Sequence, residues 1–530
     1  MNRAGWWQRG NTVVLAILAL ALAYGASLFY HLPQGWTEAA LGHAAGAEHA
    51  VAETGVAAAE AHGDGHHASP PPYWTVVPFI VLLGCIAVLP LMHKTEHWWE
   101  ENINRFKVAA GLGLVTLAYY AFFHHAPIEA HWPGHAVVPA TGGVQWGFVK
   151  AILGNAILQE YIPFIVLLFS LYVIAGGVRI QGDLTANPIT NASFMAVGGL
   201  LASFIGTTGA AMVLIRPLLE TNRERKHVAH TVIFFIFIVC NCGGCLLPIG
   251  DPPLFLGYLN GVDFTWTLSL WKEWVFVNGA ILVVYTLLDH FYFHRQETIA
   301  DVQRDITQTR KLQISGLAVN GPLLLGVVLA VALLDPSKAV PGTGGWHPPM
   351  YLREVVQLAL VAASLQFGSR QVRKDNNFNY AAIIEVAALF VGIFICMQPA
   401  LQILNANGAD IVEKFKLGPA QFFWATGALS SFLDNAPTYL VFFQTAQDPA
   451  SALSGAHTGH VPAAILSGIS LGSVFMGAMT YIGNGPNFMV KAIAEKSGVK
   501  MPSFFGYMMW SCCVLLPIMA AMNWLFLAEG

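Results

Sequence analysis

About eleven apolar runs, each long enough to cross a bilayer as a helix, constrain this chain more than any other feature. A hydrocarbon core ~30 Å thick takes about 20 helical residues to span. Only 11% of the 530 residues are charged, against about a quarter in soluble domains. The sequence therefore predicts an all-α polytopic membrane protein, and no basic stretch indicates a nucleic-acid partner. The runs begin near Thr12, Thr75, Phe106, Tyr161, Val228, Leu268, Ser315, Leu352, Tyr380, Val461 and Phe504.

The distribution of Lys and Arg predicts the orientation, because cytoplasmic loops are enriched in both. One threading puts the N-terminus and the basic segments 93–107, 221–227, 369–374 and 491–500 on the same side. We therefore expect a multi-pass protein of the bacterial inner membrane with a cytoplasmic N-terminus. This threading works only if the segments around 193–220 and 420–446 each enter and leave the membrane on one side, as re-entrant hairpins.

The first apolar run, from Thr12 to Tyr30, has the form of either a signal peptide or a first span. No small-x-small cleavage site follows it, which favours a retained span. We divide the chain into an N-terminal transmembrane segment (1–30), a His/Ala/Gly-rich extracytoplasmic linker (31–73), two peripheral transmembrane helices (74–140), a first transport repeat (141–300), connecting transmembrane helices (301–379) and a second, inverted transport repeat (380–530).

An internal repeat organises the second part of the chain. The segment "SFIGTTGAAMVL" (203–214) aligns without a gap with "SFLDNAPTYLVF" (431–442). Two further pairs keep the same order: 160–177 matches 385–402, and "PIGDPPLFLGYLNG" (248–261) matches "YIGNGPNFMVKAIAEKSG" (481–498). In the predicted threading the two halves have opposite orientations. Inverted repeats with interrupted helices are the architecture of secondary transporters.

The interruptions combine helix breakers with short polar side chains, in "GTTG", "GDPP", "DNAP" and "GNGP". Backbone that leaves the helix inside a membrane must line a cavity or be buried in protein, since lipid cannot satisfy its N–H and C=O groups. Four such breaks, two in each half, are able to converge on one polar site.

Over roughly residues 140–530 these motifs resemble the ion-transporter superfamily, whose members share paired re-entrant hairpins, paired interrupted helices and alternating access. The stretches "ASFIGTTGAAMVLIRPLL" and "PIGDPPLFLGYL" resemble the NhaD-type sodium/proton antiporters and the citrate transporters. The dicarboxylate branch carries Ser-Asn-Thr at both hairpin tips, whereas this chain has Gly-Thr-Thr at 206–208 and Asp-Asn-Ala at 434–436. That departure argues against a dicarboxylate substrate. The resemblance to the superfamily also implies that the protein is a homodimer.

Ionisable residues inside a membrane usually face a cavity and serve ion movement. Structural ion pairs are the alternative explanation, with Arg216 or Lys491 as partners. We expect the ion or substrate site to be formed by Thr207, Thr208, Asp251, Asp434, Asn435, Thr438, Asn484 and Asn487. We expect supporting charges from Glu160, Glu385, Arg216 and Lys491.

Oxygen ligands of this kind suit a hard cation such as Na⁺. Burial away from water favours the neutral form of a carboxyl group, so the same group can hold a proton when the cation is absent. Competition between Na⁺ and H⁺ for intramembrane carboxylates then suffices for antiport, with Na⁺ as the transported or coupling ion and no cofactor. The alternative is Na⁺- or H⁺-coupled uptake of citrate or a related small carboxylate.

A membrane-embedded enzyme or electron-transfer subunit is a third class. The sequence offers no clear bis-His pair on facing helices, no soluble catalytic domain and no nucleophile motif, so we expect no enzyme. "CNCGGC" (240–245) is explained by small residues where helices approach closely, with a metal site as the alternative. His62, His66 and His67 are weak metal candidates in the linker, and His124, His125, His131 and His135 fall in the next outer loop.

Overall fold

The computed structural model describes residues 4–53, 70–92, 94–297, 310–447 and 458–527, and helices dominate them. These residues form two compact units, each assembled from separate stretches of the chain. Unit 1 comprises residues 1–170, 325–367 and 380–403, and unit 2 comprises 171–324, 368–379 and 404–530. The helical, polytopic fold class predicted from the sequence is confirmed. The histidines at 62, 66 and 67 lie outside the described residues.

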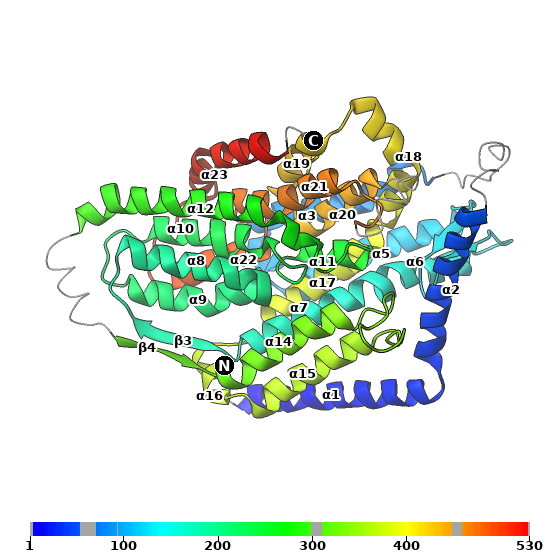
Figure 1. Ribbon diagram of the computed structural model, residues 1–530, viewed down its shortest axis with the longest axis horizontal. Coiled ribbons are helices and arrows are strands. Elements are labelled where there is room, and N and C mark those ends of the chain that lie inside the picture. The colour runs from blue at the N-terminus through cyan, green and yellow to red at the C-terminus, as the bar shows by residue number, and fades with distance from the viewer. Residues whose placement is uncertain (1–3, 54–69, 93, 298–309, 448–457, 528–530) are drawn as a thin grey trace. The chain divides into compact units, whose positions relative to one another are not determined.

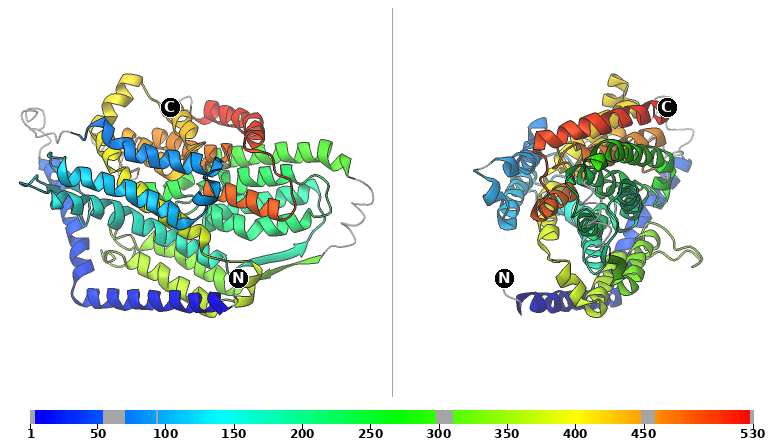
Figure 2. Two further views of the ribbon diagram at one scale, coloured as in Figure 1. Left: turned by 180° about the vertical axis from the view of Figure 1, so that it is seen from behind. Right: turned by 90° about the vertical axis from the view of Figure 1, so that its left-hand side faces the viewer.

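Unit 1 is a bundle of helices with one short β-hairpin. Helix α5 packs against α3 and α17, and α1 packs against α15; Figure 2 shows α3 and α5 side by side, in blue and cyan. The elements are α1 (Ala4–Phe29), α2 (Leu32–Glu53), α3 (Val77–Val88), α4 (Glu96–Trp99), α5 (Asn102–Phe122), β1 (Ile128–Ala130), β2 (Ala136–Val138), α6 (Trp146–Leu153), the π-helical η3 (Gly154–Tyr161), α15 (Leu352–Phe367) and α17 (Ala381–Cys396). Part of the predicted linker is therefore helical, in α2.

Unit 2 holds both hairpins and both interrupted helices. Its elements are β3 (Arg179–Asp183), α8 (Pro188–Ile205), α9 (Thr207–Thr221), α10 (Ala229–Val239), η4 (Cys242–Cys245), α11 (Pro252–Leu259), α12 (Trp271–Leu288), η6 (Asp289–Phe293), β4 (Arg310–Ser315), α16 (Arg370–Asp375), α19 (Pro419–Ser430), α20 (Asn435–Ala446), α21 (Ala463–Met476), η9 (Gly477–Met479), α22 (Gly485–Lys496) and α23 (Phe504–Phe526). Three helices cross the boundary between the units: α7 (Ile162–Ala175), α14 (Leu317–Leu333) and α18 (Gln398–Phe415).

Helix α10 is the centre of unit 2. Its residues from His230 to Val239 are all buried, as expected for a helix that is apolar on every side. Helices α8, α9 and α12 pack around it, and β3 pairs antiparallel with β4 (Figure 1).

Each hairpin is two helices joined at a short break, at the positions that the sequence predicts. Only Gly206 separates α8 from α9, and residues 431–434 separate α19 from α20. The half-helices α11 and α22 both carry proline in their first turn, where its fixed φ suits a helix start.

Fewer single helices are long and apolar enough to span a membrane than the apolar runs predict. Five helices among the described residues are long and apolar enough, or six if the bent pair α17 and α18 forms one span. The predicted spans beginning near Val228 and Val461 are shorter apolar helices, because backbone breaks follow α10 and α21 directly. The apolar runs continue through these breaks, so composition alone does not show where each helix ends.

The two units divide each predicted repeat. The leading helices of the repeats, which carry Glu160 and Glu385, contribute to unit 1, whereas the hairpins and interrupted helices that follow belong to unit 2.

Candidate functional site

Asp251 is the centre of a buried polar cluster to which both repeats contribute. It is the N-cap residue of α11 and is only 1% exposed. The Thr207 hydroxyl donates to Asp251 Oδ1 at 2.9 Å, and the Asn484 amide donates to the same oxygen at 3.2 Å. The Asn435 amide donates to Asp251 Oδ2 at 2.5 Å. One carboxylate therefore joins all four interruptions of the helices.

The four residues of this cluster are two pairs of equivalent positions in the repeat. Asp251 aligns with Asn484, and both are extended N-cap residues, with φ and ψ of −142° and 142° at Asp251 and −150° and 140° at Asn484. Thr207 aligns with Asn435, and each begins the second helix of its hairpin. The alignment made from the sequence thus corresponds to matching backbone geometry.

A second layer of amides holds Asn484 in place. Asn484 also donates to the Cys240 carbonyl at 3.0 Å and to Asn241 Oδ1 at 3.3 Å. Asn241 in turn donates to Asn487 Oδ1 at 2.8 Å. Asn487 is buried, and its amide nitrogen donates to the carbonyls of Gly477 and Thr480, each at 2.9 Å. The bonds of Asn484 and Asn241 cross between the repeats, whereas those of Asn487 stay within the second repeat and satisfy backbone carbonyls beside its break.

Sequence reasoning missed Asn241, which lies within "CNCGGC". Its signal was available: it is an amide inside an apolar run, directly before a break. The glycines of that motif allow close packing, as predicted, since a Cβ on Gly243 would meet the Gly199 Cα at 2.5 Å. Three cysteines of the motif are buried free thiols.

The two hairpin tips differ for a backbone reason. Gly206 has φ of 78° and ψ of 149°, a conformation that L side chains rarely adopt. Asp434, its counterpart, has φ of −57°, and its carboxylate accepts from the Ala436 backbone N–H at 3.1 Å as the N-cap of α20. The first hairpin tip therefore has no acidic residue at the position equivalent to Asp434, because the backbone there favours glycine.

The other residues predicted for the unit 2 site make no described hydrogen bond to Asp251. The Thr438 hydroxyl donates to the Asp434 carbonyl at 3.0 Å. Thr208 is half-buried. Lys491 pairs with Glu495 at 3.6 Å and lies over the ring of Tyr481. Among the described contacts, neither Lys491 nor Arg216 pairs with Asp251 or Asp434.

The two predicted glutamates belong to unit 1. Glu385 forms an ion pair with Arg105 at 2.9 Å. Glu160 lies in the π-helical turn η3, and within the described part of the chain its Oε2 is buried without a hydrogen-bond partner. A π-helical turn inside an α-helix is frequent at functional sites.

Two of the four histidines predicted in one loop, His131 and His135, form a pair. His131 Nδ1 lies 2.9 Å from His135 Nδ1 in the β1–β2 hairpin. Burial, together with the neighbouring His135, lowers the pKa of His131 to about 4, so His131 is neutral at physiological pH. No group of three or more His, Cys, Asp or Glu residues in the described ranges is arranged to hold a metal ion.

Comparison with known proteins gives a family match and an alignment to a solved structure. A family model described as "Putative citrate transport" matches residues 68–527, which agrees with the resemblance drawn from the hairpin motifs. No curated protein matches the sequence significantly. Among solved structures, the Alcanivorax borkumensis YdaH transporter, reported to have an unusual topology, is 14% identical with a TM-score of 0.43, and the alignment covers 86% of this chain and 97% of that chain.

Proposed function

The chain belongs to the family described as "Putative citrate transport" and is a multi-pass secondary transporter, and we propose that it exchanges Na⁺ for H⁺ by alternating access. In this proposal the Asp251 cluster binds either ion, and Asp434 supplies a second carboxylate at the tip of the second hairpin. We further propose that the protein is a homodimer of the bacterial inner membrane with its N-terminus in the cytoplasm.

The observation that carries this proposal is the composition of the cluster. Asp251 is surrounded by a hydroxyl and two amides, and none of its described contacts is with Lys or Arg. A polyanion such as citrate needs opposite charge to offset its desolvation, whereas a small cation needs oxygen ligands. The cluster supplies oxygens and one negative charge.

Asn435 adds a detail that favours a cation. Its amide nitrogen bonds to Asp251, while its amide oxygen is buried and has no hydrogen-bond partner among the described residues. Burying an unpaired oxygen is costly, and a bound cation would relieve that cost. Asp251 and Asn435 are therefore the first ligands that we assign to Na⁺.

A single carboxylate is enough to couple the movement of Na⁺ to the movement of H⁺. Na⁺ and H⁺ each neutralise Asp251, so the site holds one or the other. A neutralised cluster can be carried between the two sides of the membrane, whereas a bare buried carboxylate meets a large desolvation penalty. Exchange follows if the loaded forms reorient and the empty charged form does not.

Transport into proteoliposomes tests the proposal. With a pH gradient imposed across the membrane, added Na⁺ should collapse the gradient, and labelled citrate should not accumulate. The Na⁺ concentration for half-maximal effect should rise as pH falls, because protons compete for the same carboxylate. Citrate accumulation without Na⁺-dependent proton movement would overturn the antiport proposal.

Asp251→Asn provides the residue-level test. The variant keeps the shape of the side chain but removes its charge, so Na⁺-dependent collapse of the gradient should be lost while the purified protein stays monodisperse. Glu495→Gln, on the half-helix whose N-cap is Asn484, is the matched control and should exchange normally. Normal exchange by Asp251→Asn would place the ion site elsewhere.

Na⁺- or H⁺-coupled citrate uptake is the second candidate function, and the family description favours it. The same proteoliposomes distinguish the two functions, since citrate uptake driven by a Na⁺ or pH gradient is its direct readout. If both activities occur, Asp251→Asn should abolish both, because a coupling ion would use the same carboxylate.

A further inference from the structure

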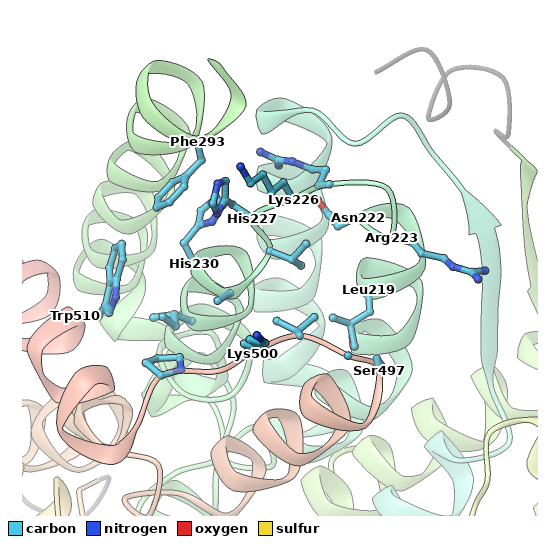
Figure 3. A pocket seen from close by; sticks show the side chains of 17 residues that line it. Leu219, Asn222, Arg223, Lys226, His227, His230, Phe293, Ser497, Lys500 and Trp510 are labelled. Carbon is cyan, nitrogen blue, oxygen red and sulfur yellow. The ribbon is translucent and has the colours of Figure 1, made fainter. Parts of the chain in front are cut away.

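A basic pocket lies in unit 2 at the N-terminal end of α10. Its volume is about 630 Å³, and it is lined by ten residues between Leu219 and Ile233, by Phe293, by the loop 497–502 and by Trp510. Figure 3 shows Lys226, His227 and His230 at one side of the pocket and Lys500 on the loop below them. None of the described residues that line it is acidic, whereas Arg223, Arg225, Lys226 and Lys500 are cationic. The pocket therefore presents positive charge without a lining carboxylate.

Two acidic side chains beside the pocket, Asp289 and Glu297, are already paired. Arg225 donates to both oxygens of Asp289, and its Nε lies 3.3 Å from Glu297 Oε1. His230 Nε2 lies 3.0 Å from Asp289 Oδ1. Two carboxylates thus face the single guanidinium of Arg225, so Arg225 adds no positive charge for a ligand. The exposed cations Lys226 and Lys500 make no ion pair with a described residue, so their charge is available to a ligand.

Helix α10 contributes the open N–H groups of its first turn. Its N-cap residue, Val228, supplies no side-chain hydrogen bond, and Val228, Ala229 and His230 line the pocket. The first N–H groups of a helix and its dipole favour an anion at this end.

A buried ring nitrogen in the pocket wall is an independent sign of a ligand. His230 is 2% exposed, and its Nδ1 has no hydrogen-bond partner among the described residues, although Nε2 is bonded to Asp289. The buried Nε2 of His227, which also lines the pocket, has no described partner either. Two ring nitrogens are therefore able to bond to a bound molecule.

The surroundings of the pocket are apolar and aromatic. Trp510 and Phe293 line it. Four exposed apolar or aromatic side chains lie within three residues of a lining residue in the sequence: Phe291, Tyr292, Phe505 and Met509. Exposed aromatic side chains are enriched at the level of lipid headgroups. Basic pockets between helices at this level suit the headgroups of anionic lipids.

We propose that this pocket binds the phosphate group of an anionic phospholipid, with Lys226, Lys500 and the first turn of α10 as its ligands. The lipid tails would then lie against the exposed aromatic side chains. This site is separate from the Asp251 cluster, and its occupancy does not depend on which ion or acid the protein transports.

Thermal unfolding of delipidated protein in a neutral detergent tests the proposal. Phosphatidylglycerol should raise the unfolding midpoint in a saturable manner, and phosphatidylcholine should not. In the variant Lys226→Ala/Lys500→Ala the phosphatidylglycerol concentration for half-maximal effect should rise about tenfold or more. Both lysines are exposed, so the variant should fold. Lys272→Ala/Lys414→Ala, which removes two exposed lysines that do not line the pocket, should respond as the wild type does.

Two results would overturn the proposal. Equal stabilisation of the wild type and Lys226→Ala/Lys500→Ala would place the lipid elsewhere. Stabilisation by inorganic phosphate with no effect of phosphatidylglycerol would show that the pocket takes free phosphate instead of lipid. The charge reversal Lys500→Glu is a second probe, since it should abolish the phosphatidylglycerol effect while Na⁺-dependent collapse of a pH gradient stays measurable.

Discussion

At the residue scale, the hydrogen bonds to Asp251 decide how readily it keeps its charge. Each neutral donor that points at a carboxylate stabilises the charged form against protonation. Thr207, Asn435 and Asn484 are three such donors, and none of them brings a charge of its own. Together they offset part of the cost of burial and leave the carboxylate able to attract a cation.

Thr207→Val should weaken Na⁺ binding. The substitution keeps the shape of the side chain but removes one donor to Asp251, and hydrogen bonds to charged groups contribute about 1.5–3 kcal/mol. The Na⁺ concentration that half-maximally collapses a pH gradient should therefore rise about tenfold or more. Thr207→Ser, which keeps the hydroxyl, should stay close to wild type.

Thr208→Val is the matched control for this substitution. Thr208 is the next residue, is half-buried, and has no described hydrogen bond to Asp251. If Thr208→Val and Thr207→Val weaken Na⁺ binding equally, the effect comes from the hairpin as a whole and not from the hydroxyl on Asp251.

At the element scale, pairs of glycines let the broken helices come close enough to share one site. A Cβ on Gly250 would collide with the Gly244 carbonyl, and a Cβ on the equivalent Gly483 would collide with the Gly477 carbonyl. Both pairs have the same spacing of six residues. The close packing of each break thus repeats in the two halves, as the N-cap geometry does.

Gly250→Ala should destabilise the protein. The added methyl group has no space between the Gly244 carbonyl and the Ser203 Cα, and overpacking of this kind costs about 1–3 kcal/mol. The unfolding midpoint of the purified protein should fall by several degrees. Gly485→Ala lies at the second break, where a Cβ meets nothing within 4 Å, and should leave the midpoint unchanged. A stable Gly250→Ala variant would contradict the packing described for this break.

At the scale of the whole molecule, the Asp251 cluster and the leading glutamates of the repeats belong to different units. All four residues that form the Asp251 cluster belong to unit 2, whereas Glu160 and Glu385 belong to unit 1. Glu385 pairs with Arg105 inside its own unit. Its charge is therefore satisfied locally.

Glu385→Gln should alter stability slightly and ion affinity not at all. The Glu385 side chain is 42% exposed, and partly exposed ion pairs contribute about 0–1 kcal/mol. The unfolding midpoint should change little, and the half-maximal Na⁺ concentration in the proteoliposome assay should match that of the wild type. A large rise in that concentration would show that Glu385 takes part in ion binding.

The helix breaks and their partners were predictable because their signals are local. Gly and Pro beside a short polar residue in an apolar run indicate a break, and the repeat pairs Thr207 with Asn435 and Asp251 with Asn484. Which carboxylate would form the centre of the cluster was not predictable, because this depends on which side chains the fold brings together. Asn241 was missed although its signal, an amide directly before a break in an apolar run, is local as well. The apolar runs that begin near Val228 and Val461 form shorter helices than predicted, because composition does not register a backbone break.

The equivalence of Asp251 and Asn484 has a consequence for duplicated chains in general. If both copies of this position carried aspartate, two like charges would face each other across about 3 Å and could not both ionise. With an amide in one copy, the two side chains form a hydrogen bond instead of repelling each other. The two halves share a backbone plan, and the neutral amide of Asn484 lets them meet at this point without two like charges.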